Sequence, residues 1–353
     1  MDSDRRDFLK GIGGITAAVA AGAACDVAPE ALQAAGLDPA AVATSSDVAL
    51  RVRASTTGPV ALELDGAPAG WVSFVGGGEA TADVVTEQPG PGSPFAKKHI
   101  GGVGYEDLVL TCATGMTEDF YGWLHDAMNG QFRPRDGAIV QYDRNLREVR
   151  RLEFRQGLLT QLGLPALSAS AQTPGSFRVV ITPEYTRRVA GRPAPANAGP
   201  PKTPRWVVSN FRLTIPGLES ALSSVTTVGA LTTKFVLGPD LTGGFRDDTR
   251  PARVEVPNLV FTVAESRADS VVAWHEDFVI KGNSYDAKER SGTLEFFDPT
   301  LSKVLFTIGF EHLGIFRLGA PPLGVSTGTV RLLTAEVYAE RISFTAGRAA
   351  TGP

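Results

Sequence analysis

The feature that most constrains this chain is an internal repeat. Shifting the sequence by 151 places brings its two halves into register without a gap over a long stretch. The matched residues are apolar, glycine or aromatic: Leu62 with Leu213, Leu64 with Ile215, Gly66 with Gly217, Gly78 with Gly229, Val85 with Val236, and Trp123 with Trp274. The motif LVLT at 108–111 falls on LVFT at 259–262 by the same shift. One offset kept through these motifs indicates a tandem duplication.

Beyond the tryptophans the alignment needs two changes, both in loops, where insertions are tolerated. The second copy first gains four residues, so that GAIVQYD at 137–143 matches GTLEFFD at 292–298. The next loop then loses three residues. The remaining pairs are Phe154 with Phe306, Gly157 with Gly309, Arg178 with Arg331, Tyr185 with Tyr338, and Arg188 with Arg341.

The repeat sets the predicted domain boundaries. Copy one covers 47–189 and copy two covers 205–345, with a tail at 346–353. Between them, 190–204 is rich in proline and lacks a hydrophobic period, which is typical of a semi-rigid linker. We assign 1–25 to a leader and 26–46 to a spacer.

Each copy is predicted to be mainly β with one helix. VALEL at 60–64 alternates apolar and polar residues and stops at Asp65-Gly66, a pair typical of tight turns. Similar runs at 149–156 and 303–309 are predicted strands, with a short hairpin turn at 144–146. Many short strands with one helix per repeat favour two tandem rolled sheets or small barrels, each plugged by its helix.

A helix is predicted over 117–129, with Thr117 as its cap and Gly130 after its end. A second is predicted over 270–281. Trp123 and Trp274 lie on the apolar stripes of these helices, so we expect both to anchor a core.

The first copy resembles the contractile-phage tail tube protein family, which is related in fold to the type VI secretion tube protein. The resemblance is carried by the LDG turn, the YEDLVLT strand, the Trp helix ending in NG, and the GAIVQYD strand. It covers nearly all of copy one, and copy two inherits it through the repeat. Two features depart from the family: a second domain and an export-like leader.

The resemblance implies a β-barrel-like subunit whose sheets pair edge to edge in a hexagonal ring, with rings stacked into a hollow tube. It also implies a loop that bridges adjacent rings, which falls here at 86–102, with a counterpart at 238–251. The candidate ring-stacking residues in this loop are Pro89, Gly90, Pro91, Phe95, Lys97 and Lys98.

The leader resembles a twin-arginine export signal. Its motif residues are Arg5, Arg6, Phe8, Leu9 and Lys10, and an Ala/Gly-rich segment with small residues suited to signal peptidase follows. An ordinary amphipathic helix is the alternative. Cys25 suggests lipidation, but the residues before it lack the aliphatic position of a lipobox, and simple cleavage is favoured.

Composition excludes several classes of protein. The net charge of −4 argues against a nucleic-acid-coating surface. The longest apolar stretch, at 11–24, is too short and too weakly apolar to span a bilayer. Two cysteines, Cys25 and Cys112, provide no disulfide framework, and Cys112 is expected in a buried strand.

No pattern typical of a catalytic, cofactor-binding or metal site occurs in the sequence. The four histidines lack ligand spacing, and Gly76-Gly77-Gly78 precedes a strand-like segment rather than a helix. An arginine cluster at 144–155 is interleaved with acidic residues, which favours salt-bridged interface charge.

The sequence therefore predicts a non-enzymatic, exported subunit of a phage-tail-like tube, needing no cofactor. We expect three two-domain chains to form a pseudo-hexameric ring. Expected partners are further copies of the chain and sheath or baseplate proteins, with DNA or an effector as lumen cargo. The alternative is a secreted two-domain β-rich binding module, and without export, assembly in the cytoplasm.

Overall fold

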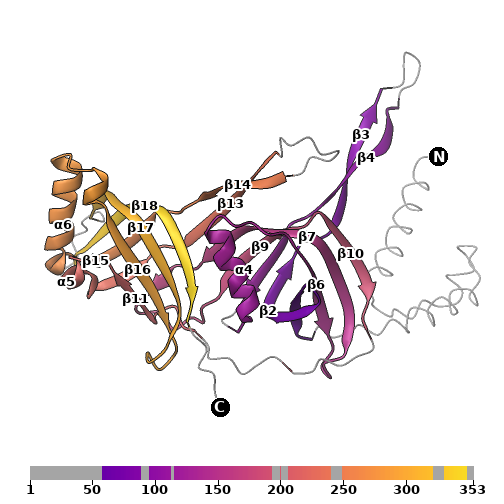
Figure 1. Ribbon diagram of the computed structural model, residues 1–353, viewed down its shortest axis with the longest axis horizontal. Helices are drawn as coiled ribbons and strands as arrows, with labels where there is room; N and C mark the ends of the chain where they lie inside the picture. The colour runs from indigo at the N-terminus through magenta and orange to yellow at the C-terminus, as the bar shows by residue number, and fades with distance from the viewer. Residues whose placement is uncertain are drawn as a thin grey trace, which may run out of the picture. The chain divides into compact units, whose positions relative to one another are not determined.

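The computed structural model describes residues 58–88, 95–112, 115–192, 199, 206–239, 249–320 and 330–347. All of them belong to one compact unit, Thr57–Pro353. The fold is mainly β, with one closed and one nearly closed barrel and few helices (Figure 1). We call 58–192 the first half and 206–347 the second half.

The first half contains a closed barrel. Its strands pair in the order β7-β6-β1-β2-β5-β9, and β9 pairs back onto β7. The bounds are β1 (Val60–Leu64), β2 (Ala67–Gly76), β5 (Leu108–Cys112), β6 (Arg135–Tyr142), β7 (Glu148–Leu164) and β9 (Phe177–Thr182), with β10 (Tyr185–Ala190) pairing β7 as well. The predicted turn after β1 is confirmed, with Asp65 and Gly66 both at positive φ.

The second half forms a nearly closed barrel in the order β11-β16-β17-β18-β15-β12. The bounds are β11 (Phe211–Thr214), β12 (Val225–Val228), β15 (Leu259–Ala264), β16 (Arg290–Phe297), β17 (Val304–Gly319) and β18 (Leu332–Ala346). In the first half, β1 and β2 close the barrel as a hairpin. In the second half a short helix, α5 (Glu219–Leu222), lies between β11 and β12, which do not pair with each other.

The predicted helices are α4 (Glu118–Met128) and α6 (Asp269–His275). Thr117 caps α4 by accepting a hydrogen bond from the Phe120 amide at 3.4 Å. The second prediction, 270–281, holds only in part, because after α6 the chain continues as a π-helix, Glu276–Ile280. With α5 and the 3-10 turns Glu265–Arg267 and Asp286–Lys288, the second half has more than the one helix expected.

Two hairpins leave the barrels. The first is β3 (Ala80–Glu87) with β4 (Lys97–Tyr105), and the second is β13 (Leu231–Pro239) with β14 (Thr249–Glu255). The prediction of a loop over 86–102 was wrong at both ends, because strand residues extend to Glu87 and resume at Lys97. The Val, Thr and Ala residues of β3, and the β-branched residues opposite them on β4, favour strand structure. In the sequence, the neighbouring glycines and lysines concealed this preference.

Pairing registers recur between the halves. Leu62 lies opposite Ile139 in β1 and β6, and Leu213 lies opposite Leu294 in β11 and β16. These are the residues that the repeat matched.

The registers correct the alignment further along. Phe154 lies opposite Gly137, and Phe310 lies opposite Gly292. Since the two glycines correspond, Phe154 corresponds to Phe310 and not to Phe306, and the loop gains one residue instead of losing three. A shift of four residues keeps every side chain on the same face of a strand, so the apolar pattern could not expose this error.

The same comparison corrects the end of the alignment. Tyr185 lies opposite Arg155, whereas Arg341 lies opposite Glu311. Because β7 and β17 correspond at an offset of 156, Tyr185 corresponds to Arg341 and not to Tyr338.

The pair Gly78–Gly229, near the start of the alignment, also changes by two residues. Gly76 lies opposite Val109, and the Gly229 amide donates to the Val260 carbonyl at 2.8 Å. Gly229 therefore corresponds to Gly76 instead of Gly78.

One apolar core runs through both halves. Trp206 is buried and packs edge-on against Phe296 and Phe306, at centroid distances of 5.0 and 5.5 Å. Phe306 in turn lies 6.5 Å from Phe177 of the first half. The halves are thus joined through apolar packing and not only through the connecting chain.

Candidate assembly interface

The most informative site is the junction between the two halves, where a hairpin of one extends the sheet of the other. Strand β13 pairs antiparallel with the end of β7, from Leu231 opposite Leu164 to Lys234 opposite Gln161. This is strand addition, in which backbone groups of one sheet edge are satisfied by another segment. In Figure 1 the β13–β14 hairpin leads from the second half toward β7, and β13 is the strand of the hairpin that pairs with β7.

Side chains close this junction. Phe235 on β13 is 2% exposed and packs edge-on against Phe132 of the first half, with centroids 5.8 Å apart. Thr233 is also buried, and Val254 on β14 packs against the core. The second hairpin is therefore anchored by apolar contacts as well as by backbone pairing.

Helix α4 makes a second contact across the junction. Tyr121 stacks on Phe344 of β18, with centroids 5.7 Å apart. Nδ1 of His125 lies 2.9 Å from the carbonyl oxygen of Phe344. The sequence predicted that each helix packs on the sheet of its own copy; in addition, α4 contacts the second half through Tyr121 and His125.

A short strand completes the junction from the other side. Residues Leu167–Ser168 form β8, which pairs with β12 through Thr227 opposite Ser168 and Val228 opposite Leu167. The second half thus contributes β13 and β14 to the sheet of the first half, and the first half contributes β8 to the sheet of the second.

The first hairpin has no such cover. Strands β3 and β4 pair with each other and form a separate two-stranded sheet among the described residues. All eight residues of β3 are exposed, and so are Ile100 and Val103 on β4. Figure 1 shows this hairpin projecting away from the sheet that precedes it.

A sheet edge in the second half is also open. Strand β17 pairs with β16 only as far as Leu313, whereas its pairing with β18 continues to Gly319. Within the described part of the chain, nothing pairs with residues 314–319 on the side opposite β18. We call this stretch the open edge of β17.

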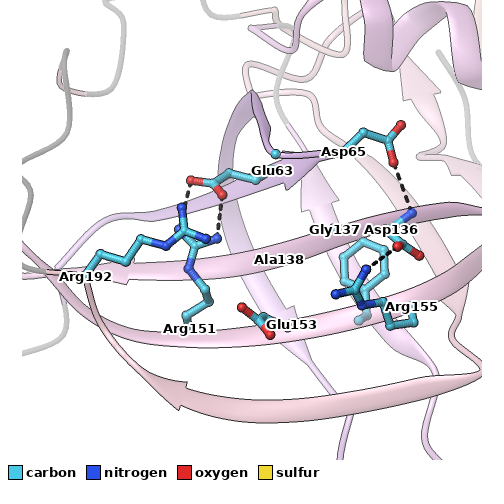
Figure 2. Close-up of a pocket in the computed structure, with 11 residues that line it drawn as sticks. Glu63, Asp65, Asp136, Gly137, Ala138, Arg151, Glu153, Arg155 and Arg192 are labelled. Atoms are coloured by element: carbon cyan, nitrogen blue, oxygen red, sulfur yellow. Dashed lines mark hydrogen bonds and ion pairs between the residues drawn. The ribbon is translucent and has the colours of Figure 1, made fainter.

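A charged pocket of about 340 Å³ lies on the first-half barrel. Figure 2 shows Arg151 and Glu63 at one end of it, and Arg155 with Asp136 at the other. The Arg151 side chain is 4% exposed and donates to Glu63 and to Glu148, with a 2.8 Å bond from Nε to Oε1 of Glu148. The pocket's charges are largely paired with one another, which is a structural arrangement.

The pKa values of these groups follow from their partners. Burial acts to raise the pKa of Glu148, but hydrogen bonds and charge from Arg151 outweigh it, so the pKa is lowered. The pKa of Asp136 is lowered first by the hydrogen bond from the Gln156 amide, and also by Arg155. Both carboxylates are held in their charged forms. The prediction that the arginine cluster forms salt bridges is confirmed for Arg151 and Arg155.

A second cluster was missed by sequence reasoning. Atoms of Glu289, His312 and Glu340 lie within 4.8 Å of one another, a spacing that three ligands of one metal ion can have. Nδ1 of His312 is 2.8 Å from Oε2 of Glu289. The other carboxylate oxygen of Glu289, Oε1, accepts a hydrogen bond from the Tyr338 hydroxyl. The hydrogen bond between His312 and Glu289 raises the pKa of His312. The three residues lie on different strands or turns, so no sequence spacing could reveal them.

The sequence-predicted site residues are placed as follows. Trp123 and Trp274 are each 4% exposed, and Trp123 donates from Nε1 to the Arg133 carbonyl at 2.8 Å. Phe95 is exposed, and Lys97 and Lys98 lie on β4 instead of in a loop. Outside the described residues lie Arg5, Arg6, Phe8, Leu9, Lys10, Cys25, Pro89, Gly90 and Pro91. Cys112 is fully buried, as expected.

Comparisons with known proteins give matches among solved structures. A chain of the sheath–tube complex of the extracellular contractile injection system PVC, in the extended state, is matched over 97% of its length and 41% of this chain, at 15% identity and a TM-score of 0.35. A chain of the cap that terminates the tube of the anti-feeding prophage is matched over 95% of its length and 43% of this chain, at 14% identity and a TM-score of 0.31. Hcp1 from Flavobacterium johnsoniae is matched over 95% of its length and 39% of this chain, at 12% identity and a TM-score of 0.25.

No protein-family profile matches this chain, and no curated protein matches it. Among the described residues, no helix is long and apolar enough to cross a membrane.

Proposed function

We propose that this chain is a non-enzymatic structural subunit of a phage-tail-like tube. The observation that carries the proposal is the junction between the halves, where β13 extends the sheet of β7. A chain that joins its own halves by strand addition, and leaves a similar hairpin and a sheet edge open, is suited to repeat that junction with further copies. Repetition of one head-to-tail contact closes a ring when the rotation allows it.

The proposal includes a tandem duplication, with domains at 47–189 and 205–345 joined by the linker 190–204. Backbone conformation supports it independently of residue identity. Leu146 and Leu301 both have φ of 58°, and Gln156 and His312 have φ of 48° and 56°. Positive φ is uncommon for residues other than glycine. Leu146 and Leu301 lie in the turns before β7 and β17, and Gln156 and His312 lie at corresponding positions within those strands.

With two domains per chain, three chains supply the six domains of a pseudo-hexameric ring. Stacked rings form the tube, with sheath or baseplate proteins as partners and DNA or an effector as lumen cargo, as in the family that the sequence resembles. Purified protein viewed by negative-stain microscopy should show rings or tubes. Mass measurement of soluble rings should give three times the 37.2 kDa of one full chain, less any leader removed. Six chains per ring, or a monomer at high concentration, would refute the trimer.

The alternative is a secreted two-domain binding module. Exposed Val84, Ile100 and Val103 on the β3–β4 hairpin favour it, since such residues can contact a surface partner. A monomer that binds a glycan or protein surface through this hairpin would support the module over the tube.

Export by the twin-arginine route, with removal of the leader, is part of the proposal and rests on the RRDFLK motif. Replacing Arg5 and Arg6 by lysine should trap full-length precursor inside the cell. Normal processing of the double variant would refute the signal assignment and leave cytoplasmic assembly as the alternative.

A further inference from the structure

The junction inside the chain uses two parts: a donor hairpin, β13–β14, and an acceptor edge, residues 161–164 of β7. Both parts have counterparts that are not used within the described chain. The β3–β4 hairpin corresponds to the donor, and the open edge of β17 corresponds to the acceptor. The pairing of residues in the internal junction therefore predicts which residues would pair in a contact between two chains.

The two hairpins share one register. Ala82 lies opposite Val103 in the first, and Phe235 lies opposite Val254 in the second. The first hairpin differs in its environment. Val254 packs against the core, whereas its counterpart Val103 is 62% exposed.

The two acceptor strands also share one register, which is marked by a bulge. In β7 the bulge against β9 falls between Leu159 and Gln161, and in β17 the bulge against β18 falls between Ile315 and Arg317. Gln161 therefore corresponds to Arg317, and Leu162 corresponds to Leu318. In β7 this stretch is covered by β13, and in β17 the same side is open.

Exposed apolar residues lie around the open parts. Phe316 next to the bulge of β17 is 41% exposed. On α6, Val272 occupies the position that corresponds to Tyr121 and is exposed, whereas Tyr121 is covered by the second half through Phe344. Among the described residues, the face of α6 around Val272 thus lacks the contact that its counterpart on α4 makes with the second half.

A second open edge fits the same arrangement. Phe74 on β2 is exposed, and β2 extends beyond its pairing with β1, which ends at Val72. The residue of β12 that corresponds to Phe74 is Thr227, which pairs with β8. In the described part of the chain, no strand pairs with this edge of the first half as β8 pairs with the second.

We propose that β3 of one chain adds antiparallel to the open edge of β17 in a second copy of this chain, with Ala80 opposite Leu318 and Thr81 opposite Arg317. This contact repeats the internal pairs Thr233–Leu162 and Lys234–Gln161. It rests on the proposed function and names the surfaces by which chains join into a ring. Two different junctions then alternate around that ring, one within chains and one between them.

Charge supports the register. Glu79 precedes β3, and Asp83 lies at the bulge between Ala82 and Val84, so both carboxylates flank Thr81 in the chain. The Arg317 side chain is 69% exposed and donates to Glu336 on β18, and Glu79 accepts from Arg188. In the proposed contact Arg317 would lie opposite Thr81 and near the two flanking carboxylates. Opposite charges at such positions stabilise strand pairs modestly and disfavour shifted registers.

Cysteine cross-linking tests the register directly. The full chain carries Cys25→Ser, while Cys112 stays, because it is fully buried and unavailable. The variant Thr81→Cys/Arg317→Cys is assembled, oxidised and run on a non-reducing gel. We expect disulfide-linked species of two and three chains. Their amount should be at least about tenfold higher than for the control variant Thr81→Cys/Leu318→Cys, whose second cysteine faces the other side of the sheet.

Two further variants serve as controls. Lys234→Cys/Gln161→Cys should form a link within one chain, because those residues are already opposite each other, and it shows that a pair at this position can be oxidised. Mixing a Thr81→Cys chain with an Arg317→Cys chain should give a product of two chains only, which establishes that the link is head to tail.

The outcomes separate the two proposals. Rings that form without the Thr81–Arg317 link, while the internal control is oxidised, overturn the junction and leave the tube function standing. Linked species that are no more abundant than in the Leu318 control also overturn it. A monomer with no link at any concentration overturns both. Rings with the expected link, closing at three chains, support both.

Discussion

Replacing Arg151 by methionine should destabilise the first-half barrel strongly. The Arg151, Glu148 and Glu63 side chains are 4%, 6% and 14% exposed, so removing the guanidinium leaves two buried carboxylates without their cation. Breaking a buried ion pair from one side costs about 3–5 kcal/mol. With an m-value of about 3 kcal/mol/M, the midpoint of urea unfolding should fall by about 1–2 M at neutral pH.

Two controls isolate the cause. Arg155→Met removes an arginine whose side chain is 61% exposed, so its ion pair with Asp136 should contribute only about 0–1 kcal/mol. A triple variant, Arg151→Met with Glu63→Gln and Glu148→Gln, leaves no buried charge and should recover much of the loss. If Arg151→Met unfolds at the same urea concentration as Arg155→Met, or the triple variant is no more stable than the single one, the reasoning is refuted.

Three other predictions follow from burial and hydrogen bonding. Trp123→Ala should lower the free energy of unfolding by about 3–5 kcal/mol, because it empties a core position and orphans the Arg133 carbonyl; an unchanged thermal unfolding curve would contradict this. The hydrogen bond to Glu289 raises the pKa of His312 in the folded protein. Protonated His312 therefore stabilises the fold fully below about pH 6.5, and this stabilisation is lost as pH rises through the raised pKa. His312→Gln should therefore flatten the dependence of the urea midpoint on pH in that range, and an unaltered profile would rule this out. Burial raises the pKa of Cys112, so in a Cys25→Ser chain thiol labelling should need denaturant, and fast labelling of native protein would show that the strand opens.

Local patterns in the sequence predicted individual elements well. The alternation at Val60–Leu64 and the Asp65-Gly66 turn placed β1 correctly, and Thr117 and Gly130 bounded α4 within a residue. These signals depend on neighbours in the chain, so a single sequence contains them. The mainly β fold of rolled barrels follows from the number of such elements.

Contacts between distant segments were not predictable in the same way. Nothing near Leu231 indicates that β13 pairs with β7 of the first half, because the two strands are far apart in the sequence and their pairing depends on which sheet edges lie together in the folded protein. The alignment error at Phe306 has the same origin, since apolar alternation is unchanged by a shift of four residues. The grouping of Glu289 with His312 likewise depends on the register of β17.

The pairing of β13 with β7 within one chain also changes how an assembly responds to dilution. Segments tethered to each other meet at an effective concentration set by the connecting chain, whatever the number of molecules in solution. In a ring of three such chains, half of the junctions form on folding, and the amount of closed ring varies with the third power of free chain concentration instead of the sixth. A tenfold dilution then lowers ring concentration roughly a thousandfold rather than a millionfold. In the proposed tube, a chain that contains one junction can therefore form rings at concentrations too low for ring formation by subunits that each supply a single domain.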